Sequence, residues 1–184
     1  MKKIIAICFC LAVAVGVKAQ KTVPEIKAGT VMYANAFVQG QEFPLLLTVK
    51  SITAPVSIAW SVEGYGEGAF EMSAKSVDNG TQLLAVTQPA LGVTKLSDTE
   101  TFGIISKAAF KTLSDTKAFT YGGINFKVKT PETAAVKISG KEVDVFHVIS
   151  EDGKQELWIL NSAAFPLIVQ SAGQATDITI SEIK

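Results

Sequence analysis

The sequence contains no arginine, and all 17 of its basic residues are lysines. The planar guanidinium group of arginine is the usual means of holding a carboxylate or phosphate through two hydrogen bonds, so a site of that kind is excluded. Seventeen acidic residues balance the lysines and leave no net charge. Because nucleic-acid binding depends on clustered positive charge, we expect no nucleic-acid partner.

Cysteine is also scarce, because the chain has only Cys8 and Cys10. Both lie in residues 1–19, which have the lysine start, the apolar run and the small residues near the end that are typical of a secretory signal peptide. We predict cleavage between Ala19 and Gln20. Loss of both cysteines then excludes a disulfide, a thiolate nucleophile and a cysteine metal ligand from the mature chain.

No long apolar run follows the predicted signal peptide. The run inside residues 1–19 is itself shorter than the roughly 20 apolar residues that cross a bilayer. We therefore expect the mature chain, residues 20–184, to be a single β-rich domain that is periplasmic or secreted and does not span a membrane. A lipoprotein signal is the alternative, but neither Cys8 nor Cys10 follows the small residue that lipidation requires.

The chain is rich in apolar residues, which make up 48% of it against 18% charged residues, and this balance excludes intrinsic disorder. Many of the apolar residues alternate with polar ones, as in Val56, Ile58, Trp60 and Val62. A period of two is typical of a strand with one buried face. Similar alternation marks residues 43–49, 70–74, 124–129 and 177–181.

Turn residues separate these predicted strands. Gly122-Gly123, Ser139-Gly140 and Asp152-Gly153 each predict a chain reversal, because such pairs supply the positive φ angles of tight hairpin turns. Asp78-Asn79-Gly80 is predicted to be a further hairpin turn. Pro44 predicts an edge or a bulge in its strand, because proline cannot donate to a strand ladder. The spacing gives about ten strands with mainly antiparallel connections.

One segment has helical spacing. Ser97 and Glu100 form a capping box, the pair of side chains that satisfies free N–H groups at the start of a helix. Apolar residues then recur on one side of the predicted helix, which ends at Ser114-Asp115. These residues are Phe102, Ile105, Ala109, Phe110 and Leu113.

These elements predict a mainly β fold. The predicted arrangement is an antiparallel sheet of about ten strands, curved around the one amphipathic helix as a half-barrel. In it the apolar faces of the strands and the apolar side of the helix are buried against each other. The alternative is a two-sheet β-sandwich with the helix at its side. Both arrangements place the apolar side of the helix against strands.

Few residues are suited to catalysis. His147, the only histidine, lies in an apolar strand, and the sequence has no Gly-x-Ser-x-Gly nucleophile motif. We interpret His147 as a packed side chain with one hydrogen bond. Glu63, Glu67 and Glu71 are candidate paired carboxylates for a hydrolase, but the glycines between them indicate a solvated loop. We expect no metal and no cofactor.

Large apolar side chains are the candidate binding residues. Trp60 and Trp158 either line a pocket or fill the core, since both have a large apolar area. A sheet curved around a single helix has more apolar wall than the helix covers, and ligand pockets are typically apolar concavities. The candidate pocket residues are Trp60, Phe102, Ile105, Phe126 and Trp158.

Several stretches follow a shared pattern: LSDTETFGIISKAAFKTL at Leu96–Leu113, ELWILN at Glu156–Asn161, and FPLIVQ at Phe165–Gln170 with the terminal ITISEI at Ile178–Ile183. This pattern resembles a family of small secreted or envelope β-rich proteins of unknown function from Gram-negative bacteria. In that family a helix precedes hairpins, a W-x-L strand and a proline-leucine strand. The pattern is also similar to periplasmic lipoprotein carriers, whose curved sheet encloses a cavity around helices. Typical carriers expose an arginine there, which this sequence lacks.

The sequence therefore predicts a non-enzymatic protein, secreted or periplasmic, that binds an apolar ligand or an envelope component. The expected partner is a lipid or another apolar small molecule. One alternative is a structural or interaction protein that docks another envelope protein, which a flat exposed apolar patch would favour. The other is a hydrolase, which acids converging in a cleft would favour.

Overall fold

The computed structural model of this chain describes residues 21–131 and 135–184. The predicted signal peptide and its cleavage site at Ala19 and Gln20 lie outside the described residues. About 50% of the structure is strand and 10% is helix, so the predicted mainly β class is confirmed. Neither helix in these two ranges is long and apolar enough to cross a membrane.

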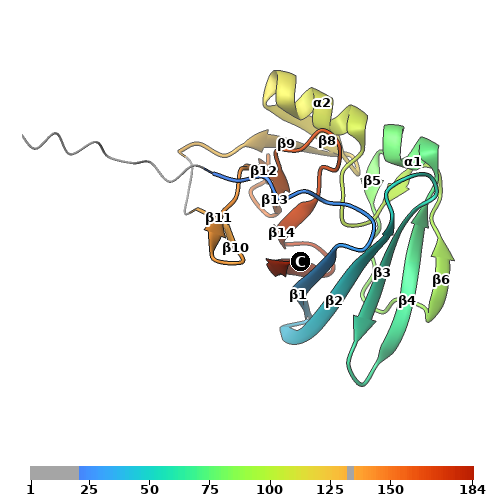
Figure 1. The fold of residues 1–184 in the computed structure, drawn as a ribbon. Helices are drawn as coiled ribbons and strands as arrows, with labels where there is room; N and C mark the ends of the chain where they lie inside the picture. The colour runs from blue at the N-terminus through green and yellow to red at the C-terminus, as the bar shows by residue number, and fades with distance from the viewer. Residues whose placement is uncertain (1–20, 132–134) are drawn as a thin grey trace, which may run out of the picture.

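Fifteen strands and two helices follow one another in the described part of the chain (Figure 1). The strands are β1 (Val31–Val38), β2 (Gln41–Ser51), β3 (Val56–Val62), β4 (Gly66–Met72), β5 (Gln82–Leu83), β6 (Gly92–Lys95), β7 (Glu100–Thr101), β8 (Ala118–Tyr121), β9 (Ile124–Val128), β10 (Lys137–Ile138), β11 (Lys141–Glu142), β12 (Val145–Ser150), β13 (Glu156–Leu160), β14 (Ile168–Ala172) and β15 (Asp177–Ile183). The helices are α1 (Ala74–Asn79) and α2 (Lys107–Thr116), which lie at the same end of the molecule.

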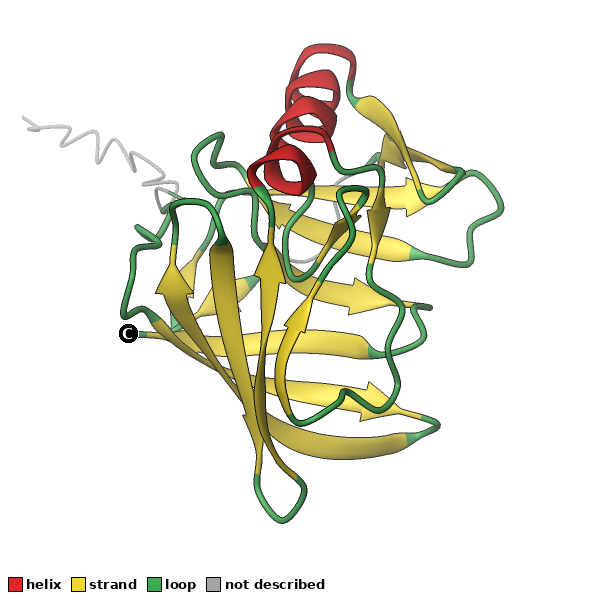
Figure 2. Ribbon diagram, turned by 90° about the vertical axis from the view of Figure 1, so that its right-hand side faces the viewer, coloured by secondary structure: helices red, strands yellow, loops and turns green. Residues whose placement is uncertain are grey.

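Eleven strands form one large sheet in the order β6-β4-β3-β2-β1-β15-β14-β13-β12-β9-β8. Its neighbouring strands are antiparallel except for β4 and β6, which are parallel. The edge strands β6 and β8 do not pair with each other, so the sheet is not closed into a barrel. Figure 2 shows how strongly it bends, since some strands run upright in that view and others run across. The main sheet is therefore one open sheet, and β5 with β7 and β10 with β11 form two further two-stranded sheets.

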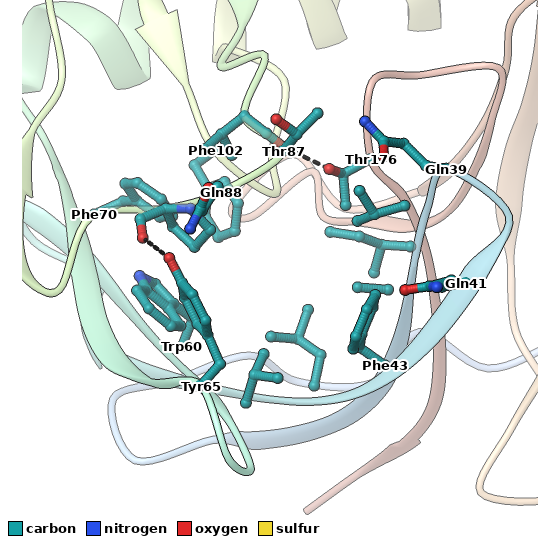
Figure 3. Close-up of a pocket in the computed structure, with 17 residues that line it drawn as sticks. Gln39, Gln41, Phe43, Trp60, Tyr65, Phe70, Thr87, Gln88, Phe102 and Thr176 are labelled. Atoms are coloured by element: carbon teal, nitrogen blue, oxygen red, sulfur yellow. Dashed lines mark hydrogen bonds between the residues drawn. The ribbon is translucent and has the colours of Figure 1, made fainter.

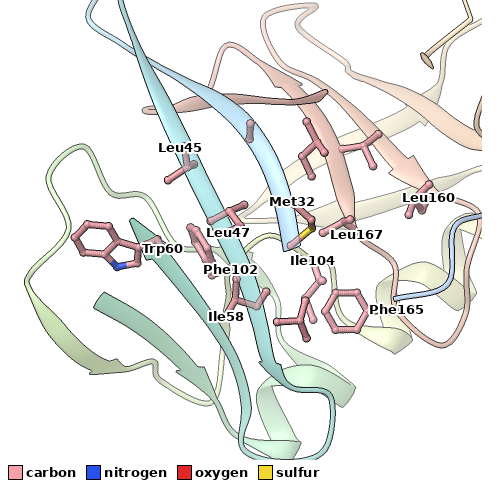
Figure 4. Packing of buried hydrophobic residues seen from close by; sticks show 14 of the residues in the cluster. Met32, Leu45, Leu47, Ile58, Trp60, Phe102, Ile104, Leu160, Phe165 and Leu167 are labelled. Atoms are coloured by element: carbon pink, nitrogen blue, oxygen red, sulfur yellow. The ribbon is translucent and has the colours of Figure 1, made fainter. Parts of the chain in front are cut away.

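Two clusters of buried side chains fill the structure. The first core is built mainly from β1 to β4 and the β13–β15 region, and Figure 4 shows Phe102 and Ile104 reaching into it from the segment before α2. The second core lies between α2 and strands β8, β9, β12, β13 and β14. Strand β13 serves both, because Leu157 and Ile159 belong to the second core and Leu160 to the first. Its alternate side chains therefore leave neither face to solvent.

Strand β2 lies inside the sheet, between β1 and β3, although Pro44 predicted an edge or a bulge. The pairing register explains how the proline is tolerated. Pro44 lies opposite Asn35 of β1, whereas the pairing of β2 with β3 begins only at Leu45, opposite Val62. At Pro44 the strand therefore has one neighbour and is locally an edge, where a missing N–H costs no ladder bond.

The predicted turns at Gly122-Gly123, Ser139-Gly140 and Asp152-Gly153 are confirmed, and they join β8 to β9, β10 to β11 and β12 to β13. The hairpin turn predicted at Asp78-Asn79-Gly80 is wrong. These residues end helix α1, whose N-cap Ser73 accepts a hydrogen bond from the Ser76 backbone N–H.

The predicted helix exists, but its predicted start is wrong. Helix α2 begins at Lys107 with Ser106 as its N-cap, not at the Ser97 capping box. Glu100 instead opens β7, which pairs with β5, and Gly103 has φ +70°, a left-handed conformation that a helix cannot contain. The Ser97 backbone N–H and hydroxyl do donate to the Glu100 carboxylate, but they do so within an exposed turn.

Candidate functional site

A hollow lies on the face of β1–β4 that bears the first core. Its volume is about 370 Å³. The segment 84–91, which joins β5 to β6 and has no strand or helix, forms one side of the hollow, and we call this segment the strap. The lining residues are Ala36, Val38, Gln39, Gln41, Phe43, Leu45, Trp60, Val62, Tyr65, Phe70, Val86, Thr87, Gln88, Pro89, Phe102, Thr176 and Ile178 (Figure 3).

Aromatic rings form one wall of this cavity, and the buried rings of this wall are also its floor. The Phe70 and Phe102 ring centroids are 4.4 Å apart, and those of Trp60 and Tyr65 are 5.9 Å apart. Gly68 of β4 makes room for the Trp60 indole, because a Cβ at this glycine would lie only 2.8 Å from an indole carbon. The indole Nε1–H is buried and has no hydrogen-bond partner among the described residues.

Two hydrogen bonds fasten the strap over the cavity, and both are visible in Figure 3. The Tyr65 hydroxyl, from the turn between β3 and β4, donates to the Pro89 carbonyl at 2.7 Å. The Thr176 hydroxyl, from the turn between β14 and β15, donates to the Val86 carbonyl at 2.5 Å. A smaller hollow of about 100 Å³ is also lined by Val86 and Thr176. The hydrogen bond between Thr176 and Val86 therefore borders both the cavity and the smaller hollow.

The cavity has a buried apolar floor and an exposed mouth, where glutamines lie beside the exposed rings of Phe43 and Tyr65. Trp60, Phe70 and Phe102 are buried, whereas the glutamines of the lining are exposed. Gln39 and Gln41 flank the tight turn between β1 and β2, where Gln39 has φ +51° and the intervening glycine +80°. Figure 3 shows these two glutamines on the side of the mouth opposite the aromatic wall. None of the lining residues is an acid, a lysine or a histidine.

The five predicted pocket residues separate into three places. Trp60 and Phe102 both line the cavity. Ile105 and Phe126 are instead packed in the second core. Trp158 lies against the edge of the first core, where its ring stacks on His147 with centroids 4.1 Å apart.

The cavity residues that sequence reasoning missed are the glutamines at its mouth and the strap. Gln39 and Gln41 gave a signal of their own, because they flank a glycine between two apolar strands, which is the sequence of a tight turn. The strap gave none, since its place over β1–β4 depends on Tyr65 and Thr176, which lie 24 and 90 residues away from their partners in sequence.

His147 belongs to a separate polar cluster. It is 5% exposed, and its Nε2 lies 2.5 Å from the Glu156 carboxylate. Lys129 also reaches Glu156, with its Nζ 2.8 Å from Oε1. The hydrogen bond from Lys129, together with the contact to His147, holds the pKa of the Glu156 carboxyl below its ordinary value. The contacts with Trp158 and Glu156 fit the predicted packing role.

The acidic residues of the β3–β4 hairpin do not line the cavity. Glu63 and Glu67 are exposed in or near the turn, and Glu71 alternates with the buried Phe70 along β4. No group of three or more histidine, cysteine, aspartate and glutamate side chains within 21–131 and 135–184 has a geometry that would hold a metal ion.

Comparison with known proteins adds no relative. No protein-family model, no curated protein and no solved structure matches this chain. The resemblance to small envelope proteins and to lipoprotein carriers therefore stays a prediction from the sequence.

Proposed function

We propose that this chain is a non-enzymatic binding protein, periplasmic or secreted, that holds a small apolar molecule in the cavity beneath the strap. The observation that supports this most is the cavity itself. Protein interiors are normally close-packed and leave few spaces larger than a water molecule. A hollow of about 370 Å³ beside a well-filled core lies within the size range of ligand pockets.

The chemistry of the lining supports binding over catalysis. The floor offers aromatic and aliphatic surface, and each ligand methylene group that leaves water for such surface contributes about 0.8 kcal/mol. The lining residues supply no carboxylate, imidazole, ammonium or thiol group to act as an acid, base or nucleophile. Amides and hydroxyls at the mouth are suited to orienting a bound molecule.

The test is uptake of the uncharged fluorescent probe N-phenyl-1-naphthylamine by the purified protein, together with mass spectrometry of an organic extract of protein isolated without denaturant. We expect saturable uptake and an extracted small molecule. A clean extract without saturable uptake would contradict the proposal and leave docking to another envelope protein as the better reading.

A matched pair of variants locates the bound probe. Val62→Trp places a large side chain in the cavity lining, whereas Ser61→Trp adds the same ring from the neighbouring residue of β3, which is not in the lining. Side chains of successive strand residues point to opposite faces. We expect Val62→Trp to abolish uptake and Ser61→Trp to retain it. Equal uptake by both variants would place the probe elsewhere.

A further inference from the structure

The segments that form the cavity contain no cationic residue. Lysine is the only strongly basic residue type in the chain, and none lies within residues 31–49, 56–72, 84–91 or 176–178. His147, the single histidine, is on β12 and does not line the cavity. A ligand with a carboxylate or phosphate group would therefore find no opposite charge at any depth of the site.

The same segments do contain acids, but none of them lines the cavity. Glu63 is exposed in the β3–β4 turn, and the Asp177 carboxylate accepts hydrogen bonds from the Ser171 hydroxyl and the Gly173 and Gln174 backbone N–H groups.

The other three acids lie on the opposite face of their strands. Glu67 and Glu71 alternate with Gly68 and Phe70 along β4, and Glu42 lies between two lining residues of β2. Side chains of successive strand residues point to opposite faces. The Glu42 carboxylate accepts a hydrogen bond from the Asn35 amide at 2.6 Å. A cationic ligand in the cavity would thus also lack a partner inside it.

The mouth is built for hydrogen bonding without charge. Gln39, Gln41 and Gln88 each present an amide that can donate and accept, and Thr87 adds a hydroxyl. These four side chains are exposed, as are Phe43 and Tyr65 beside them, while the floor formed by Trp60, Phe70 and Phe102 is buried. An elongated molecule with one apolar end and one hydroxyl, ester or amide end fits both zones.

We infer that the ligand is an uncharged amphiphile, with its apolar part on the aromatic floor and its neutral polar group among the glutamines. This inference rests on the proposed function and names the chemical class of ligand for the same cavity. Its physical reason is that an ion at this mouth gains no partner charge among the lining residues, and any part of it that leaves water does so at a cost that a neutral group does not bear. A neutral hydroxyl or amide group instead forms hydrogen bonds with the glutamine amides.

The experiment compares three competitors with apolar chains of nine or ten carbons for bound N-phenyl-1-naphthylamine at pH 8: 1-decanol, decanoate and decyltrimethylammonium. They share a similar apolar chain and differ in the charge of the polar end. We expect 1-decanol to displace the probe at a concentration at least tenfold below that of either ion. Equal displacement by an ion would overturn the inference while leaving the proposed function intact, whereas failure of the wild-type protein to take up any probe would overturn both.

A charge change at the mouth makes the test sharper. Gln41→Lys places one cation among the lining residues, and we expect it to improve displacement by decanoate about tenfold relative to displacement by 1-decanol. Glu42→Gln is the matched control, because it shifts the net charge by the same unit from the opposite face of β2. An equal gain for decanoate in both variants, or no gain in Gln41→Lys, would overturn the placement of the polar group beside Gln41.

Discussion

Glu156 is a half-buried carboxylate held by two other titratable side chains. It is bound by both Lys129 and His147, and the His147 ring in turn stacks on Trp158. Hydrogen bonds to charged groups contribute more to stability than those between neutral groups, and a buried group left without its partner is costly. The cluster is therefore expected to stabilise the fold and not to act on a ligand.

The direction of the Glu156 pKa shift gives a pH-dependent prediction. The pKa of the Glu156 carboxyl is lower in the folded chain than its ordinary value of 4.5. As the pH falls to 4.5 and below, the unfolded chain therefore binds more protons than the folded chain, and acidification favours unfolding. The stabilisation by the carboxylate is complete above about pH 6 and is lost as the pH falls through 4.5 towards the lower folded value. We expect Glu156→Gln to lower the free energy of unfolding by about 1–3 kcal/mol at pH 7, and by less at pH 3.5.

Urea unfolding at the two pH values checks this prediction. Glu67→Gln is the control, because Glu67 is exposed and the structure shows no hydrogen bond to its side chain. A difference between wild type and Glu156→Gln that stays constant or grows as the pH falls would contradict the assigned role.

At the scale of elements, the helix shows where sequence reasoning succeeds and where it stops. The apolar spacing of Phe110 and Leu113 was sufficient to predict α2, and both side chains are buried. Phe102 and Ile105 extended the same spacing backwards, but they are buried in a non-helical segment, each in a different core. Spacing alone does not reveal that Gly103 breaks the helix, since this depends on the pairing of β7 with β5.

The corrected N-cap gives the second prediction. The Ser106 hydroxyl accepts a hydrogen bond from the Ala109 backbone N–H, and Ser106 is 1% exposed. Ser106→Ala should therefore lower the free energy of unfolding by about 1 kcal/mol or somewhat more, the usual cost of a lost cap. Ser97→Ala should cost less than about 0.5 kcal/mol, because Ser97 lies in an exposed turn. Denaturant midpoints of the two variants show which substitution is more destabilising. A larger effect of Ser97→Ala would contradict the assignment of Ser106 as the N-cap.

The strap gives the third prediction. Thr176→Val keeps the shape of the side chain and removes the hydrogen bond to the Val86 carbonyl. A hydrogen bond of this kind contributes about 1 kcal/mol net, so release of bound N-phenyl-1-naphthylamine should become roughly fivefold faster. Stopped-flow displacement by excess 1-decanol measures the rate. Thr179→Val on β15 serves as the control, since Thr179 does not line the cavity, and equal rates in the two variants would show that the strap does not limit release.

At the scale of the whole molecule, the period-two alternation of the strands and their turns was sufficient to predict a mainly β, antiparallel fold, but it left open whether the strands form one curved sheet or two packed sheets. The cavity was predicted only in part, because Trp60 and Phe102 were expected there and the glutamines and the strap were not. A strand pattern identifies which side chains face a core, but the sheet order decides which of them meet. Here that order separates Phe126 on β9 from Trp60 on β3 by seven strand positions, which places them in different cores.

Two cores that share β13 and β14 are expected to unfold together, and this is the last prediction. Leu157 is fully buried in the second core, and Leu160, three residues along the same strand, is fully buried in the first. Replacing either by alanine should cost about 2–5 kcal/mol through lost burial and the cavity left behind.

Fluorescence of Trp60 in a Trp158→Phe background reports on the first core alone. Because loosening one face of β13 weakens the strand for both, Leu157→Ala should lower the Trp60 unfolding midpoint as Leu160→Ala does, whereas the exposed Val93→Ala should leave it unchanged. A normal Trp60 midpoint in Leu157→Ala, beside a shifted midpoint from far-ultraviolet circular dichroism, would mean that the two cores unfold independently.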